Sequence, residues 1–222
     1  MFKHSIMEAF MKKGFTLAEV LITLGVIGVV AAMTMPTLIQ NHKRHEVETK
    51  LKKFYSTINQ AIKLSEAENG TCNEWDLDML NHNDTNGAYG DEFFEKYLSK
   101  YLQVSEKGDY PITSSRIAKY VRFSDGSIMI YDASRGLDIQ YLPKFVDKDN
   151  RKDGRTSFAF TFAKIDTIGA KCSIEPFTAR WDGTDEDLMN NKNFGCAVSG
   201  SYCIKLIQQN GWKIPKDYPW KF

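Results

Sequence analysis

Residues 12–36 read KKGFTLAEVLITLGVIGVVAAMTMP. Between Phe15 and Ile39 the chain carries one charge, that of Glu19, and a helix of this length reaches about 37 Å, enough to cross a bilayer with some tilt. A carboxylate within a membrane helix costs about 2.5 to 3.5 kcal/mol on insertion scales. Glu19 therefore requires a partner that offsets this cost.

Three features around this run are typical of one type of membrane protein. Gly14 follows two lysines, the apolar run begins directly after it with Phe15, and Pro36 is the twenty-second residue after Gly14. Together with Glu19, this pattern resembles the amino terminus of type IV prepilins and type II secretion pseudopilins. The resemblance covers residues 12–39.

The resemblance implies how this segment is processed and assembled. In that family a membrane-embedded prepilin peptidase cuts after the glycine that matches Gly14, and the new amino terminus, Phe15, is N-methylated. The carboxylate that matches Glu19 then pairs with the terminal amine of a neighbouring subunit. The implied partners are homologous pilin or pseudopilin subunits, the peptidase and N-methyltransferase, an inner-membrane assembly platform and membrane lipid.

The same resemblance implies a location. The chain is expected to be a single-pass protein of the inner (cytoplasmic) membrane with an extracytoplasmic carboxyl-terminal domain, and to enter a periplasmic or surface filament on assembly. The pilus, the type II secretion pseudopilus and the competence filament stay open as the machine it serves, as does a major or a minor role.

Two other interpretations of the helix stay open. A secretory signal would be removed after the apolar run, and residues 31–33 offer a site of that kind. Alternatively, the helix only tethers an extracytoplasmic binding protein or enzyme, and Glu19 stays hydrated near the lipid headgroups. The start of the leader is open as well, since Met1, Met7 and Met11 can each begin it.

The helix contains three residues that weaken it. Gly25 and Gly28 each cost about 1 kcal/mol relative to alanine, and Pro36 removes a backbone donor, so a kink is expected there. In pili that this sequence resembles, part of this segment melts to let subunits pack, which makes the three residues candidates for assembly. Close packing through small residues, found in membrane helices generally, explains the glycines equally well.

Length and charge constrain the rest of the chain. It has 222 residues, a formal net charge of +1 and no basic tract, which argues against nucleic acid as a direct partner. We divide it into a leader (1–14), a transmembrane or filament-core helix (15–39), the amphipathic second half of that helix (40–69) and one pilin-like globular domain (70–222).

Beyond the proline, apolar residues recur at steps of three and four, which predicts that the helix continues in amphipathic form and ends near residues 69–70. Glu48 stands four residues before Lys52, the favourable order for an ion pair. The predicted apolar stripe comprises Val47, Leu51, Phe54, Ile58, Ala61, Ile62 and Ser65.

The soluble part then changes to a period of two. Residues 120–131 predict a β-hairpin that turns at residues 125–126. A long amino-terminal helix packed on a carboxyl-terminal antiparallel sheet, an α+β fold, is therefore expected, and the resemblance implies the same pilin-like architecture. An extended tail after Gly211 is expected to lie on the body. Further strands are predicted at 156–162 and 177–181, and short helices at 91–102 and 202–210.

Four cysteines follow the membrane helix, and an extracytoplasmic location favours disulfides between them. Three pairings are possible, and spacing alone does not choose among them. Cys196 and Cys203 make the most local pair, which leaves Cys72 with Cys172 as a clasp between the helix end and the sheet. A zinc site competes, but no CxxC motif or nearby histidine supports it.

Residues 147–154 resemble a calcium loop, because carboxylates alternate along them before a glycine. Some pseudopilins bind calcium near the carboxyl terminus, so Asp147, Asp149 and Asp153 are calcium candidates. An EF-hand loop, however, needs an oxygen ligand and a glycine where this segment has two basic residues. An exposed charged loop is the competing interpretation, and no other cofactor is expected.

The sequence contains no GxSxG, HExxH or phosphate-binding glycine loop, and no paired acids that stand out. We therefore expect a structural subunit and no enzyme.

Overall fold

The structure, a computed structural model, describes residues 14–81, 84–133, 136–162 and 172–222. The chain divides into two compact units, residues 1–42 and residues 43–222. One helix, α1 (Leu17–Asn69), belongs to both sequence ranges. The leader before Gly14, with its three candidate start residues, lies outside the described part of the chain.

In the first unit, α1 is apolar and uncovered on every side. Leu17 is 78% exposed and Met33 74%, and the helix contains an 18-residue window of mean hydropathy 2.2 with no buried residue. The hydroxyls of Thr23 and Thr34 donate to helix carbonyls, so these polar groups have partners without water. A helix of this kind fits a single-pass membrane anchor.

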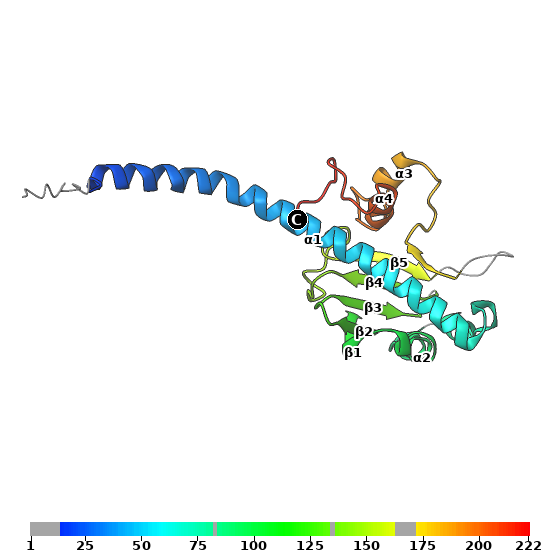
Figure 1. Ribbon diagram of the computed structural model, residues 1–222. Coiled ribbons are helices and arrows are strands. Elements are labelled where there is room, and N and C mark those ends of the chain that lie inside the picture. Colours follow the sequence, from blue (N-terminus) through cyan, green and yellow to red (C-terminus); the bar gives the residue numbers. More distant parts are fainter. Residues whose placement is uncertain (1–13, 82–83, 134–135, 163–171) are drawn as a thin grey trace, which may run out of the picture. The chain divides into compact units, whose positions relative to one another are not determined.

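The second unit is built on a six-stranded antiparallel sheet whose strands are adjacent in the order of the chain (Figure 1). The hairpin predicted at residues 120–131 is confirmed, and Gly126 occupies its turn with a φ of 77°, a conformation that glycine adopts without strain. The strands are β1 (Val104–Thr113), β2 (Arg116–Phe123), β3 (Ile128–Asp132), β4 (Asp138–Leu142), β5 (Phe158–Phe162) and β6 (Ile174–Pro176).

Within this unit, the second half of α1 lies across one face of the sheet (Figure 1). Phe54 of the helix stacks on Tyr141 of β4, with ring centroids 4.1 Å apart. The predicted stripe is confirmed apart from its half-buried first member, Val47, and the helix ends at Asn69, as expected. Its buried residues are Leu51, Phe54, Ile58, Ala61, Ile62 and Ser65. The predicted α+β, pilin-like architecture is thus confirmed.

Short helices complete the unit. Aromatic side chains between residues 93 and 97 belong to the core, because Phe93, Phe94 and Tyr97 are buried and Phe94 stacks on Tyr131 of β3, with ring centroids 4.8 Å apart. The short helices are η1 (Cys72–Glu74), η2 (Asp78–Asn81), α2 (Ala88–Tyr97), η3 (Ser99–Tyr101), α3 (Asp185–Asn190) and α4 (Cys203–Gln209).

Two predicted elements differ from the structure. The strand predicted at 177–181 is wrong: β6 ends at Pro176, Arg180 has a φ of 64°, and the N–H of Trp181 closes a turn onto Thr178. The helix predicted at 91–102 starts earlier, as α2, and ends at residue 97, where a separate 3-10 turn follows.

The opposite face of the sheet is also partly apolar. Tyr110, Ala118, Ile128, Ile130 and Leu142 form a second, smaller cluster there. Alternation along the strands separates this cluster from the residues that face α1. The sheet therefore has two buried surfaces, and side chains of two different sets line them.

Candidate functional site

Helix α1 begins with reciprocal hydrogen bonds between Thr16 and Glu19. The backbone N and the Oγ1 of Thr16 donate to Glu19 Oε2 at 2.8 and 2.7 Å, and the N of Glu19 donates to Thr16 Oγ1 at 3.2 Å. This arrangement is a capping box, which satisfies backbone donors at the start of a helix. Its Thr-x-x-Glu signal is present in the sequence, and our expectation that Glu19 depends on another chain overlooked it.

The carboxylate of Glu19 retains free acceptor capacity. Both bonds from Thr16 end on Oε2, and Oε1 accepts no hydrogen bond from the residues that the structure describes. A carboxylate has about four acceptor positions. Glu19 can therefore cap its own helix and, at the same time, accept an ammonium group from a second chain.

The residues around Glu19 are equally open. Phe15 is 87% exposed. A side chain placed at Gly14, Gly25 or Gly28 would meet nothing within 4 Å among the described residues, so packing inside this chain does not require these glycines. The helix assignment continues without a break through Pro36, and a kink there stays a prediction.

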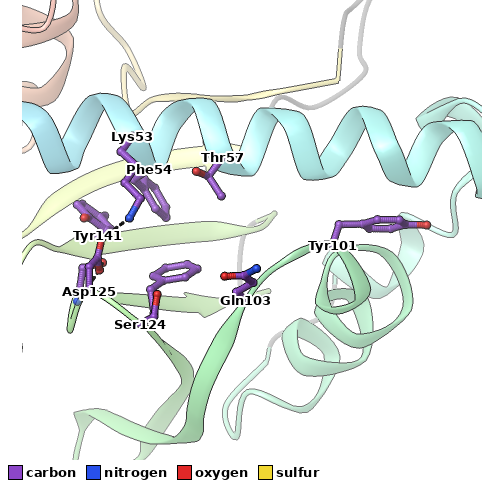
Figure 2. Close-up of a pocket in the computed structure, with 10 residues that line it drawn as sticks. Lys53, Phe54, Thr57, Tyr101, Gln103, Ser124, Asp125 and Tyr141 are labelled. Carbon is purple, nitrogen blue, oxygen red and sulfur yellow. Dashed lines mark hydrogen bonds and ion pairs between the residues drawn. The ribbon is translucent and has the colours of Figure 1, made fainter.

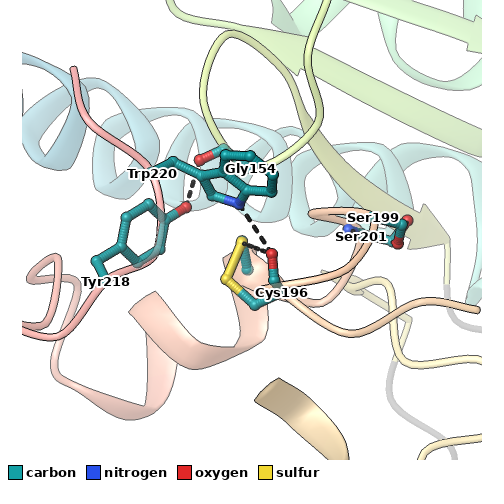
Figure 3. The surroundings of a disulfide bond; sticks show 7 residues. Gly154, Cys196, Ser199, Ser201, Tyr218 and Trp220 are labelled. Carbon is teal, nitrogen blue, oxygen red and sulfur yellow. Dashed lines mark hydrogen bonds between the residues drawn. A yellow bond between two sulfur atoms is a disulfide. The ribbon is translucent and has the colours of Figure 1, made fainter. Parts of the chain in front are cut away.

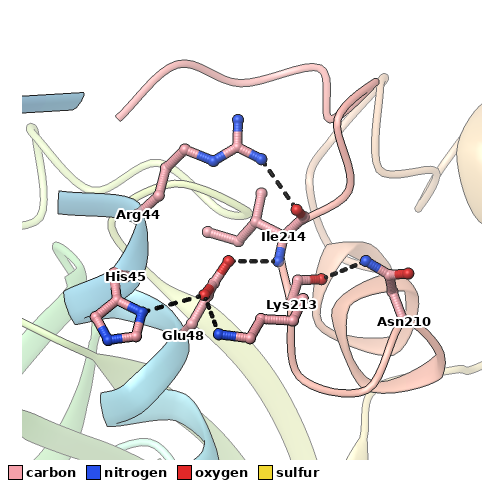
Figure 4. Close-up of polar contacts among 6 residues, drawn as sticks. All are labelled: Arg44, His45, Glu48, Asn210, Lys213 and Ile214. Carbon is pink, nitrogen blue, oxygen red and sulfur yellow. Dashed lines mark hydrogen bonds and ion pairs between the residues drawn. The ribbon is translucent and has the colours of Figure 1, made fainter. Parts of the chain in front are cut away.

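A second polar cluster holds the carboxyl-terminal tail on α1 (Figure 4). Arg44 Nη2 donates to the carbonyls of Ile214 and Pro215 at 2.9 and 2.8 Å. Glu48 accepts from Ile214 N at 2.9 Å and from Lys213 Nζ at 3.0 Å. The sequence predicted Lys52 as the partner of Glu48, but in the structure Glu48 pairs with Lys213 and Ile214 of the tail. The expectation that the tail lies on the body is confirmed.

This tail clamp is expected to weaken in acid. Burial alone raises the pKa of Glu48, but hydrogen bonds from Ile214 and Lys213, with the nearby charges of Lys213 and His45, bring the pKa below its ordinary value of 4.5. Because the folded pKa is the lower one, the stabilisation is complete above about pH 4.5 and is lost as the pH falls through the folded pKa. Hydrogen exchange of residues 213–222, measured on both sides of pH 4.5 and corrected for intrinsic rates, should show this loss.

Glu48→Gln is the matched control for the acid effect, because its amide oxygen still accepts from the backbone N–H but does not titrate. In this variant, the protection of residues 213–222 from hydrogen exchange should be the same on both sides of pH 4.5. Equal acid sensitivity in both chains would contradict the assignment of the effect to Glu48.

The tail continues over a disulfide, Cys196–Cys203 (Figure 3). Trp220 Nε1 donates to the carbonyl of Cys196 at 2.8 Å, and the Tyr218 hydroxyl donates to the carbonyl of Gly154. Burial raises the pKa of Tyr218, which keeps its hydroxyl protonated as a donor. The tail is thus fixed at several points along its length.

The second disulfide joins Cys72 with Cys172, 100 residues further along the chain. It links η1, directly after the end of α1, to the residues before β6. This pairing is the one that the local spacing of Cys196 and Cys203 favoured.

A cavity of about 280 Å³ lies between α1 and the turn of the β2–β3 hairpin (Figure 2). Phe54 and Tyr141 contribute its aromatic wall, and Lys53 Nζ lies 2.9 Å from Asp125 Oδ2 at its rim. Although partial burial opposes it, hydrogen bonds from Ser127 and Lys53 lower the pKa of Asp125 to about 2. Lys53 and Asp125 at this rim therefore form an ion pair with each other.

Comparisons with known proteins match two separate parts of the chain. Residues 10–35 match the prokaryotic N-terminal methylation motif, the prepilin-type signature of type IV pilins and pseudopilins. Residues 37–222 match a family of unknown function, DUF6613. The chain belongs to this family. No curated protein and no solved structure matches it.

Residues 37–222, the DUF6613 body, thus follow a prepilin-type amino terminus, and Pro36 is the one residue between the two matches. The motif includes five of the six residues that the sequence assigned to processing and assembly, and the sixth, Pro36, directly follows it. The five are Gly14, Phe15, Glu19, Gly25 and Gly28. The recognition of a prepilin-type segment is confirmed. The individual roles of these residues stay predictions.

The calcium candidates of the DUF6613 body are not gathered around one point. Asp147 accepts hydrogen bonds from Asn150, and Asp153 accepts one from Ser157. Within the described residues, the one group with the spacing of metal ligands is Glu66 with Cys72 and Cys172, whose cysteines form a disulfide. Calcium binding by Asp147, Asp149 and Asp153 stays an untested prediction.

Proposed function

We propose that this DUF6613 chain is a structural subunit of a type IV pilus-like filament or a type II secretion pseudopilus. Prepilin peptidase cuts it between Gly14 and Phe15, and Phe15 is N-methylated. The observation that carries the proposal is the prepilin-type motif on an apolar helical segment, residues 15–39, which no other described part of the chain covers and which contains one carboxylate, that of Glu19.

The charge of Glu19 supplies a physical reason for assembly. Cleavage after Gly14 would convert the backbone N of Phe15 into an ammonium group, four residues from Glu19 in the same chain. Two copies that pack side by side can then match the amine of one with the free Oε1 of the other. Because an unpaired charge is costly among apolar surroundings, this match favours the polymer over isolated chains.

The proposal includes a location and a set of partners. The chain starts in the inner membrane with its DUF6613 body outside the cytoplasm, which agrees with two disulfides in that body. Homologous subunits, the peptidase and an assembly platform are its partners there. The competing function, a tethered binding protein or enzyme, requires the same anchor but no ion pair between the Phe15 amine of one copy and Glu19 of another.

Mass spectrometry of the mature amino terminus tests processing. We expect the chain in membranes to begin at N-methylated Phe15, and Gly14→Leu to keep the leader. A side chain at Gly14 meets nothing within 4 Å in the described residues, so the variant should fold normally. Retention of its leader would then mean that the peptidase no longer cuts it. A start near Thr34, or an intact leader on the unaltered chain, would contradict the proposal.

A further inference from the structure

The cavity between α1 and the turn of the β2–β3 hairpin combines an aromatic wall with polar side chains (Figure 2). Phe54 and Tyr141 stack on each other, and Phe123 meets Phe54 at 67° with ring centroids 6.1 Å apart. The three rings therefore form a corner rather than two parallel faces between which a planar ligand could stack. The slightly negative faces of aromatic rings attract C–H groups, and a saturated ring carries such groups on both of its faces.

Three polar side chains of this cavity come from different elements and have no hydrogen-bond partner among the described residues. They are Thr57 of α1, Gln103, which directly precedes β1, and Ser124, which directly follows β2. Hydroxyl and amide groups can each donate and accept hydrogen bonds. The hydroxyl groups of a ligand also do both, so these three side chains match a ligand that is rich in hydroxyls.

The charged groups at the rim favour a neutral ligand. Lys53 and Asp125 are the charged residues that line the cavity, and they pair with each other at 2.9 Å. Asp125 also accepts from the backbone N and the hydroxyl of Ser127, at 3.1 and 2.5 Å. An anionic ligand would compete with Asp125 for Lys53, and a cationic ligand would compete with Lys53 for Asp125. A neutral ligand leaves this ion pair intact.

We propose that this cavity binds one residue of a neutral sugar. The C–H groups of the sugar ring pack into the corner of the three aromatic rings, and its hydroxyls exchange hydrogen bonds with Thr57, Gln103 and Ser124. The volume of about 280 Å³ lies just below the roughly 300 to 1,000 Å³ of sites for drug-sized ligands, which suits a single sugar ring. This inference does not depend on filament assembly.

Ligand-observed NMR on the full chain, in a detergent without a sugar headgroup, tests the proposal. The probes are the methyl glycosides of glucose, galactose, mannose and N-acetylglucosamine, and at least one of them should bind at millimolar concentration. Sorbitol, an open-chain alcohol without a ring face, should bind about tenfold more weakly or worse. Failure of all four probes, or equal binding of sorbitol, would overturn the proposal.

A charged analogue tests the preference for a neutral ligand. In the uronic acid form of the best probe, a carboxylate replaces the hydroxymethyl group at C6. This form should bind about tenfold more weakly or worse, because Lys53 is already paired with Asp125. Equal or tighter binding of the uronic acid would contradict a site for neutral sugars.

Substitutions locate the site. Thr57→Val and Gln103→Met keep the shape of each side chain but remove its hydrogen bonds, so each should weaken binding of the best probe about three- to tenfold. Thr49→Val is the matched control, because it makes the same replacement on the same helix, at an exposed residue that does not line the cavity. It should leave binding unchanged. An equal loss in Thr49→Val, or unchanged binding in both cavity variants, would refute the site.

Thermal unfolding without ligand separates binding from folding. Each of the three variants replaces a side chain that makes no hydrogen bond with the described part of the chain, so its melting temperature should stay close to that of the unaltered chain. If a cavity variant fails to fold, the comparison of the best probe with sorbitol and with its uronic acid form still decides the question on the unaltered chain.

Discussion

Replacing Glu19 by glutamine is expected to leave the processed chain in the membrane and to lower its recovery in filaments by about a hundredfold or more. Glutamine keeps an oxygen that accepts from Thr16, so the capping box survives. It has no charge to pair with an ammonium group, and leaving one member of a buried pair alone costs about 3 to 5 kcal/mol. Immunoblots of the filament and membrane fractions give the ratio.

Thr16→Ala is the complementary control. It removes the hydroxyl that caps α1 and keeps the carboxylate, so it should lower helix stability by about 0.5 to 2 kcal/mol and still assemble. The opposite result, with Glu19→Gln assembling like the unaltered chain and Thr16→Ala failing, would show that Glu19 serves only its own helix.

Removal of the Cys72–Cys172 disulfide is expected to lower the free energy of unfolding by about 4 to 5 kcal/mol. This bond closes a loop with a sequence separation of 100 residues, for which the chain-entropy account predicts about 4.7 kcal/mol. Because domains are stable by about 5 to 15 kcal/mol, this loss brings the fold close to its limit. Denaturant unfolding of the paired serine variant measures the effect.

The Cys196–Cys203 bond provides the internal comparison. Its partners are seven residues apart, and the same account predicts a loss of about 2.5 kcal/mol when both are replaced by serine. A loss from the local pair that equals or exceeds the loss from the long-range pair would contradict the entropic explanation. That result would also indicate that the local disulfide stabilises the domain through the tail, because Trp220 of the tail donates a hydrogen bond to the carbonyl of Cys196.

Local patterns in the sequence were sufficient for α1 and the central hairpin. The stripe from Leu51 to Ser65 repeats with the helical period, and the alternation on both sides of Gly126 belongs to a hairpin. β1 was missed because it is an edge strand with few buried residues, and Gly108 and Pro111 interrupt its apolar pattern. The strand predicted at 177–181 has suitable residues, but the chain turns there.

The candidate sites depended on different information. The prepilin-type segment is local, so its residues could be named from the sequence. The contact of Arg44 with the tail spans 170 residues, and nothing near Arg44 in the sequence indicates it.

The attachment of the tail to the start of the second unit has a consequence for protein engineering. Arg44 stands one residue after the beginning of that unit, and it binds residues 214–215 near its end. The two ends of the DUF6613 body are therefore neighbours, the arrangement that tolerates circular permutation. A short linker from Phe222 back to Lys43 would allow new termini in the exposed turn between β1 and β2. Such a permuted body could be produced without the apolar helix.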